Sequence, residues 1–202
     1  MRGQRIRLIV SLFVLGLVAT SVGAHPHVFI DSRMRAEIHG DTVTHISAHW
    51  TFDRFFTHQV MRDFNLDPSG DFSSDDVEAV RRGAFDNLRN YDYFIFIEVD
   101  GREISANNPE NFNVELNADD RLVYTFDIPV DVELTGASRK IEVAMYDEEF
   151  FVDMAFADDY IEITGTGSVE YEHDIEQNVY DTGIWGPMVR ERVVLNLRRR
   201  MP

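Results

Sequence analysis

Residues 42–52 read TVTHISAHWTF and alternate strictly between apolar and polar side chains over their second half. Side chains of a strand point to opposite faces in turn, so this stretch predicts a half-buried β-strand. Residues 27–38 before it are rich in valine, phenylalanine and isoleucine, and Gly40-Asp41 separates the two stretches. Two such segments around a Gly-Asp turn predict a β-hairpin. The predicted inner face of the second strand carries Ile46, Ala48, Trp50 and Phe52.

After this hairpin the apolar spacing becomes helical and then returns to that of strands. A first helix is indicated by five apolar residues at helical spacing: Phe55, Phe56, Val60, Met61 and Phe64. A polar loop follows, and a second helix capped by Ser74 is expected to run to about Tyr91. Five further strands are predicted at 94–99, 122–128, 141–146, 151–156 and 160–164. The segment 189–197 ends in three arginines, which suit a helix C-terminus.

These elements predict an α+β fold. We expect an antiparallel β domain of the sandwich type, interrupted by a helix–loop–helix insertion at residues 54–91 and closed by a C-terminal segment. A chain of 202 residues without internal repeats or a low-complexity linker fits one domain, at residues 25–202.

The first 24 residues have the pattern of a secretory signal peptide. Three arginines precede an apolar run of about 11 residues, and small residues follow up to Ala24. A membrane span needs about 20 apolar residues, so a cleaved leader is favoured over an anchor. We therefore expect a periplasmic protein that has no membrane span after cleavage.

The composition excludes several classes of protein. There are no cysteines, which excludes disulfides, thiolate zinc sites and thiol catalysis. The net charge is −17, from 36 acidic against 19 basic residues, and nucleic-acid binding needs a basic face. No G-x-S-x-G or H-E-x-x-H motif occurs, so we expect a binding protein rather than an enzyme.

Cleavage after Ala24 would expose His25-Pro26-His27, a candidate metal site. A terminal histidine offers its α-amine and its imidazole, and His27 adds a second imidazole, a donor set that suits Zn, Ni, Co or Cu. Pro26 has no N–H, so the planar amide-coordinated form of such motifs cannot form here. The alternative is that these two histidines bind nothing in particular.

The loop between the two predicted helices, NLDPSGDFSSDD at residues 65–76, is in register with the calcium loop of EF-hands. Its oxygen ligands would come from five residues: Asn65, Asp67, Ser69, Asp71 and Asp76. Asparagine at the first position and aspartate at the last depart from the template, so calcium would bind weakly, at about 10⁻⁴–10⁻³ M. The alternative is a loop held by hydrogen bonds alone.

Together these segments resemble the ZevA-like periplasmic proteins of unknown function. The resemblance rests on HPHVFID at residues 25–31, WTFD at 50–53, the EF-like loop, AFDNL at 84–88, YDYF at 91–94 and the acidic-aromatic segment 146–153. That family is associated with nickel/cobalt-exporter-like permeases and with zinc or related metals. The resemblance implies His25 and His27 as metal ligands and adds Asp147.

Three functions remain open at this point. The first is a periplasmic metal-binding accessory of an inner-membrane Zn, Ni or Co permease, with zinc as the favoured metal. The second is a structural or protein-interaction domain in which the EF-like loop is scaffold. The third is a copper enzyme that uses the N-terminal histidine, which would need a further histidine facing His25.

Overall fold

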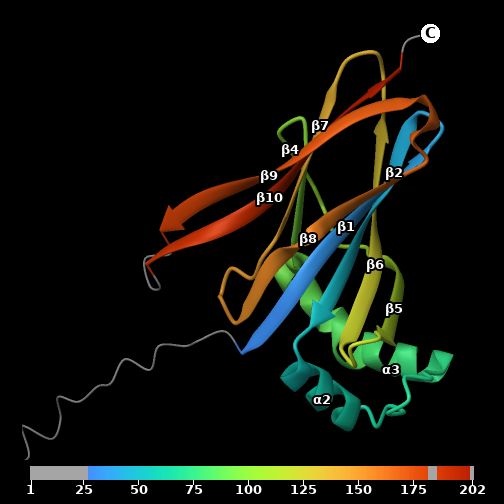
Figure 1. Ribbon diagram of the computed structural model, residues 1–202, viewed down its shortest axis with the longest axis vertical. Coiled ribbons are helices and arrows are strands. Elements are labelled where there is room, and N and C mark those ends of the chain that lie inside the picture. Colours follow the sequence, from blue (N-terminus) through green and yellow to red (C-terminus); the bar gives the residue numbers. More distant parts are fainter. Residues whose placement is uncertain (1–26, 182–185, 201–202) are drawn as a thin grey trace, which may run out of the picture.

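The computed structural model describes residues 27–181 and 186–200, which form two five-stranded sheets with the helices at one end (Figure 1). The first sheet has the order β5-β6-β2-β1-β8 and the second the order β4-β3-β7-β10-β9. All described pairings are antiparallel except that of β1 with β8, which is parallel. The strands are β1 (Val28–His39), β2 (Thr42–Phe52), β3 (Ile95–Val99), β4 (Arg102–Ile104), β5 (Glu110–Leu116), β6 (Leu122–Glu133), β7 (Arg139–Met145), β8 (Val152–Thr164), β9 (Val169–Asp181) and β10 (Pro187–Arg199).

The predicted first hairpin is confirmed. β1 and β2 pair from His39↔Thr42 at the turn to Ile30↔Phe52 at the open end, with one register shift after Glu37. The four apolar residues expected on the inner face of β2 are all buried. The alternation of residues 42–52 therefore sets which face of the first sheet enters the core.

Both sheets share one hydrophobic core, which confirms the β-rich α+β class. Trp50 of β2 is fully buried and donates from Nε1 to the sulfur of Met145 on β7, 3.4 Å away, across the two sheets. Its ring packs edge-on against Phe126, with centroids 4.8 Å apart. No helix among residues 27–181 and 186–200 is long and apolar enough to cross a membrane.

The insertion contains two helices, α2 (Arg54–Asp63) and α3 (Ser74–Gly83), followed by the 3-10 helix η1 (Phe85–Phe94). The second predicted helix is thus shorter than expected, because α-helical geometry ends at Gly83. Its cap is Ser73 rather than Ser74. Phe55, expected on the buried face of the first helix, is 75% exposed. The structure does not show an EF-hand.

The C-terminal half differs from expectation in three places. The segment 189–197 is not helical but part of β10, because its apolar residues alternate and pair with β7 and β9. The two predicted strands 151–156 and 160–164 are, apart from Phe151, parts of one long strand, β8. The strands β4, β5 and β9 were not predicted. They lie at the edges of the sheets and contain too few apolar residues to show a clear alternation.

A partly buried ion pair joins the central strands of the second sheet. The carboxylate of Glu142 on β7 accepts a hydrogen bond from Arg192 of β10 at 2.8 Å and lies 3.1 Å from the ammonium of Lys140. Burial alone would raise the pKa of Glu142, but the hydrogen bonds from Arg192 and Lys140 outweigh it and hold the pKa below its ordinary value.

This ion pair makes stability depend on pH. A depressed carboxyl pKa stabilises the folded state fully above the unfolded value of about 4.3, and the contribution is lost progressively as pH falls from there through the lower pKa of the folded state. We expect Glu142→Gln to lower the free energy of unfolding by about 1 kcal/mol at neutral pH and by much less near pH 3. Urea unfolding at both pH values measures this, and an equal loss at the two pH values would contradict it.

Gly165, at the end of β8, has a φ of +75°, and a Cβ there would overlap the carbonyl oxygen of Ile38 on β1. Gly101 has the same φ but open space around it. We expect Gly165→Ala to cost more than about 3 kcal/mol and Gly101→Ala only about 1 kcal/mol, since the second change adds backbone strain without a clash. Thermal unfolding of both variants tests this, and equal costs would refute the close approach.

Candidate functional site

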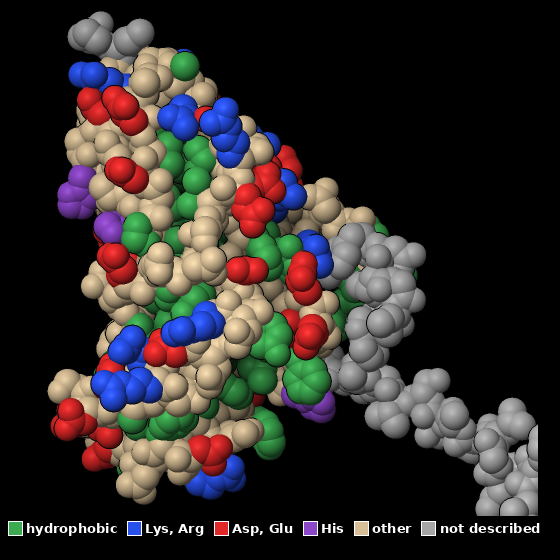
Figure 2. All heavy atoms as spheres, turned by 180° about the vertical axis from the view of Figure 1, so that it is seen from behind, with side chains coloured by type: hydrophobic (Ala, Val, Ile, Leu, Met, Phe, Trp, Pro, Cys, Tyr) green, Lys and Arg blue, Asp and Glu red, His purple; other side chains and the backbone are tan. Residues whose placement is uncertain are grey.

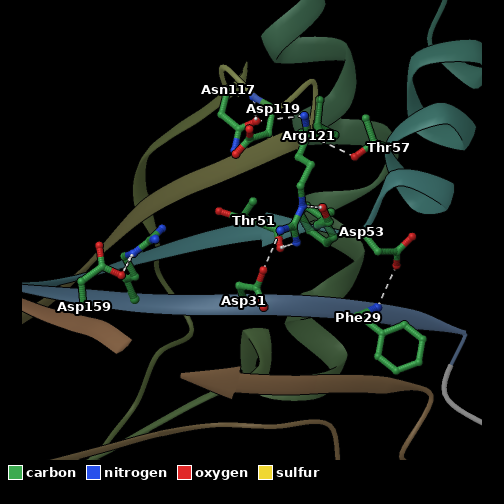
Figure 3. Close-up of polar contacts among 12 residues, drawn as sticks. Phe29, Asp31, Thr51, Asp53, Thr57, Asn117, Asp119, Arg121 and Asp159 are labelled. Carbon is green, nitrogen blue, oxygen red and sulfur yellow. Dashed lines mark hydrogen bonds and ion pairs between the residues drawn. The ribbon is translucent and has the colours of Figure 1, made fainter. Parts of the chain in front are cut away.

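The end of β2 and the start of α2 form a hydrogen-bonded junction, drawn in Figure 3. Asp53 caps α2: its Oδ1 accepts from the backbone N–H of Phe56 at 2.9 Å. Its Oδ2 accepts from the backbone N–H of Phe29 on β1, also at 2.9 Å, and its own N–H donates to the carbonyl of Phe29. One side chain therefore fixes the helix to the first strand.

Arg121, just before β6, fixes the same junction from the other side (Figure 3). Its guanidinium donates to the carbonyls of Phe52 at 2.6 Å and Thr51 at 3.0 Å, and to the carboxylate of Asp31 at 2.7 Å. It thus links β1, β2 and β6. No sequence motif includes this residue, and its one signal is that a lone arginine precedes an apolar strand.

The loop between β7 and β8 folds around the carboxylate of Asp147. Oδ1 accepts from the N–H of Glu149 at 2.9 Å, and Oδ2 accepts from the N–H groups of Phe151 at 2.8 Å and Val152 at 3.0 Å. Asp147 is only 4% exposed, so these charge-assisted hydrogen bonds determine the shape of the loop.

Two of the three residues implied as metal ligands, His27 and Asp147, both contact Phe151 of this loop. The backbone N–H of His27 donates to the carbonyl of Phe151 at 2.9 Å, and the two rings contact each other with centroids 4.9 Å apart. Phe151 in turn donates to Asp147. His25 lies outside the described residues. Within the described part of the chain, no three His, Asp or Glu side chains are grouped closely enough to hold a metal ion.

The other described histidines have separate environments. His45 lies 3.9 Å from Glu37 and from Glu110, and His173 is hydrogen-bonded to the hydroxyl of Tyr160 at 2.9 Å. Burial, and then the nearby Arg33, lower the pKa of His49. His39 and His58 are exposed.

The EF-like loop is closed by hydrogen bonds between its own residues. Asp67 accepts from the N–H and hydroxyl of Ser69 at 2.8 and 2.7 Å, and Asp76 accepts from the N–H and hydroxyl of Ser73 at 2.9 and 2.7 Å. These contacts lower the pKa of both carboxyls, so both are ionised at neutral pH. The second pair is the capping box of α3. Asn65, with a φ of +52°, and Asp71 are exposed. Calcium binding by this loop stays a prediction.

An apolar cavity of about 370 Å³ lies next to the Asp147 loop. It is bounded by the start of β1, the end of β2, the helical insertion and the loop itself. Figure 2 shows hydrophobic side chains reaching the surface beside acidic ones, close to the point where the described chain begins. The walls carry twelve apolar or aromatic residues and two acids: Val28, Ile30, Trp50, Phe52, Phe56, Ala84, Leu88, Tyr91, Phe94, Tyr124, Phe151, Val152, Asp147 and Glu149. Sequence reasoning placed several of these in the core but did not predict a cavity.

Tyr124 is the unusual member of the cavity wall. The residue is 2% exposed, and its hydroxyl is buried without a hydrogen-bond partner among the described residues. Burial raises the pKa of this hydroxyl, so it stays protonated and can only gain a partner as a neutral donor or acceptor.

Comparisons with known proteins relate the chain to two descriptions. A family model for a protein of unknown function, DUF1007, matches residues 10–182. The chain is also 30% identical, over 97 residues, to an uncharacterised 15.5 kDa protein in the trpE 3′ region of Spirochaeta aurantia. That match covers 48% of this chain and 68% of the relative. Neither description assigns an activity.

We expect Asp147→Ala to lower the free energy of unfolding by about 2–3 kcal/mol, because three partly buried hydrogen bonds from backbone N–H groups lose their charged acceptor. The neighbouring acid Glu148 is exposed and provides the control, with a change below about 0.5 kcal/mol for Glu148→Ala. Urea unfolding measures both. Similar small effects for the two variants would show that Asp147 does not determine the shape of the loop.

Proposed function

We propose that this chain, which belongs to the DUF1007 family of proteins of unknown function, is a periplasmic metal-binding accessory of an inner-membrane transporter for zinc, nickel or cobalt. Its finer resemblance to the ZevA-like proteins is part of the proposal. The observation that carries it is the position of His27, which lies against the loop that Asp147 organises. The proposal places the metal between the mature N-terminus and this loop.

The donor groups fit a transition metal. Cleavage after Ala24 would supply the α-amine and imidazole of His25 beside the imidazole of His27, and neutral nitrogen ligands suit zinc, nickel and cobalt. A carboxylate has about four acceptor positions, and the described contacts of Asp147 use three, one on Oδ1 and two on Oδ2. Oδ1 therefore retains a position for a cation or for a ligand-orienting hydrogen bond.

The charge around the loop also favours cations. Glu148 and Glu149 are exposed beside Asp147, and a small polar cavity next to them is lined by Asp92 as well. Negative charges gathered in one region raise the local concentration of positive ions. A metal held by few protein ligands would also be released readily, as delivery to a permease requires.

The second candidate is a protein-interaction domain, and the EF-like loop favours it. The carboxylates of Asp67 and Asp76 are already hydrogen-bonded to serines, which makes the loop self-supporting without an ion. The copper-enzyme alternative needs a further histidine beside His25. The alternatives predict different metals: zinc, nickel or cobalt for the transport accessory, no transition metal for the interaction domain and copper alone for the enzyme.

The test is calorimetric titration of the exported form, after its intact mass has shown whether it begins at His25. We expect one zinc, nickel or cobalt ion to bind with a dissociation constant of about 1 µM or tighter. His25→Ala combined with His27→Ala should weaken binding at least 100-fold, because it removes both imidazoles. His39→Ala combined with His58→Ala, two exposed histidines elsewhere, should leave binding unchanged.

Three results would overturn the proposal. Absence of transition-metal binding would favour the second candidate, a protein-interaction domain. Equal losses in the two double variants would place the metal elsewhere. Tight binding of copper alone would favour the enzyme, and oxidase assays of the copper-loaded protein would then follow.

A further inference from the structure

We infer that the free edge of β9 binds an extended segment of a partner protein, one that alternates basic and apolar residues, as an additional strand of the second sheet. β9 is the last strand of that sheet and, among the described residues, pairs only with β10. A strand at the edge of a sheet presents a row of N–H and C=O groups to any chain that can pair with it. The inference goes beyond the metal proposal and uses none of its residues.

The other described edge strands have features that oppose pairing. β4 has only three residues. The pairings of β5 with β6 and of β8 with β1 each contain a register shift, and the N–H of Phe156 on β8 already donates to the carboxylate of Glu191. Short strands and irregular register are means by which proteins block their sheet edges. β9, in contrast, runs for 13 residues in unbroken register with β10 and contains no proline, glycine or lysine.

The backbone groups that face the free edge of β9 are those of its odd-numbered residues. The N–H of Arg200 donates to the carbonyl of Ser168 at 2.7 Å and continues the register of the β9–β10 pairing. Neighbouring residues of a strand point their backbone groups to opposite sides, so even-numbered residues of β9 bond to β10. The N–H of Ile175 agrees with this, because it donates to the side chain of Asp174 at 2.8 Å. Odd-numbered residues from 171 to 179 therefore face a further strand.

The outer half of β9 lacks a third strand among the described residues. β9 pairs with the whole length of β10, but β7 pairs with β10 only from Arg192 to Leu197. Residues 177–181 and 187–191 therefore belong to a two-stranded arm, which projects away from the other strands in Figure 1. Two strands alone are marginally stable in water. A partner segment paired with β9 would supply the third strand.

The charge of the partner follows from one face of β9. Four acids alternate along this face: Glu170, Glu172, Asp174 and Glu176. Glu170 lies 2.6 Å from Arg198, but no ion pair within the described part of the chain involves the other three. Two copies of β9 paired antiparallel about a twofold axis would bring these acids together across the strands, which is destabilising. Lysine or arginine at alternate positions of a partner strand would attract them instead.

The apolar half of the pattern follows from the opposite face. Tyr171 and Val179 lie on it and are exposed, whereas Ile175, between them, packs partly against the core. Side chains directly opposite each other on paired strands are about 4.5–5.5 Å apart. Valine or isoleucine at the intervening positions of the partner would therefore cover these residues. An alternating segment matches both faces of β9, and a purely basic segment matches only one.

The test uses three short peptides of equal length on the full exported protein in EDTA, which removes any dependence on the metal site. The first alternates lysine with valine, the second has the same residues with all lysines at one end, and the third has glutamate in place of lysine. We expect the first to bind with a dissociation constant at or below about 100 µM. The second and third should bind at least tenfold more weakly.

Amide hydrogen exchange shows whether the peptide pairs with the backbone. The first peptide should slow exchange at odd-numbered residues from 171 to 179, because their N–H groups face the free edge. Exchange at the even-numbered residues of this range, which already bond to β10, should not change.

Proline substitutions distinguish the two edges of the arm. Val179 and Val189 lie opposite each other in the β9–β10 pairing, and both are exposed. The N–H of Val179 faces the free edge, whereas that of Val189 points away from β9. Val179→Pro should weaken the first peptide at least fivefold, since it removes one N–H from the added ladder, and Val189→Pro should leave binding unchanged. Circular dichroism and urea unfolding check that both variants fold.

Charge variants test the acidic face with the backbone intact. Glu172→Gln combined with Glu176→Gln should weaken the first peptide at least fivefold, because two attractive charges are lost. Asp119→Asn combined with Asp120→Asn removes the same charge at exposed residues before β6 and should leave binding unchanged.

The inference fails on any of four results. These are binding of the second or third peptide as tightly as the first, unchanged exchange at the odd-numbered residues, equal effects of the two proline variants, and equal effects of the two charge variants. Concentration-dependent protection of the odd-numbered residues in the protein alone would also overturn it, by assigning the edge to a second copy of this chain.

Discussion

The carboxylate of Asp53 is the contact on which the rest of the site depends. A helix that follows a strand directly must turn sharply, and its first N–H groups need acceptors. Asp53 satisfies one of them at Phe56 and also receives the N–H of Phe29 from the neighbouring strand. The direction of α2 is thereby fixed relative to β1, and Phe56 is brought to the cavity wall.

Other contacts then complete one end of the first sheet. Arg121 neutralises Asp31 and satisfies two carbonyls at the end of β2, and the hydroxyl of Thr57 on α2 accepts from the N–H of Leu122 at 2.9 Å. The Asp147 loop holds the start of β1, because the carbonyl of Phe151 accepts the N–H of His27. The expected metal ligands and the apolar cavity are neighbours because both are built on this loop.

The sequence predicted what depends on local periodicity. The hairpin at residues 27–52 and the inner face of β2 are correct because alternation is a property of neighbouring residues. The end of α3 and the strand β10 were missed, since each depends on contacts with distant segments; a Cβ at Gly83, for instance, would overlap the ring of Phe64. The cap at Ser73 is local, a capping box with Asp76, and was predicted one residue too late. His27 and Asp147 are 120 positions apart, and only the fold shows that both contact Phe151.

Stability alone does not explain the cavity wall. A core selected only for folding would replace Tyr124 by phenylalanine, since the hydroxyl is buried and unpaired, and would relax the left-handed backbone of Asp92, Tyr93 and Phe94. Both costs occur at one end of the molecule, around one cavity. Such costs are not confined to the cavity, because the hydroxyls of Ser32 and Thr51 are also buried without a partner and Phe150 in the Asp147 loop has a φ of 61°.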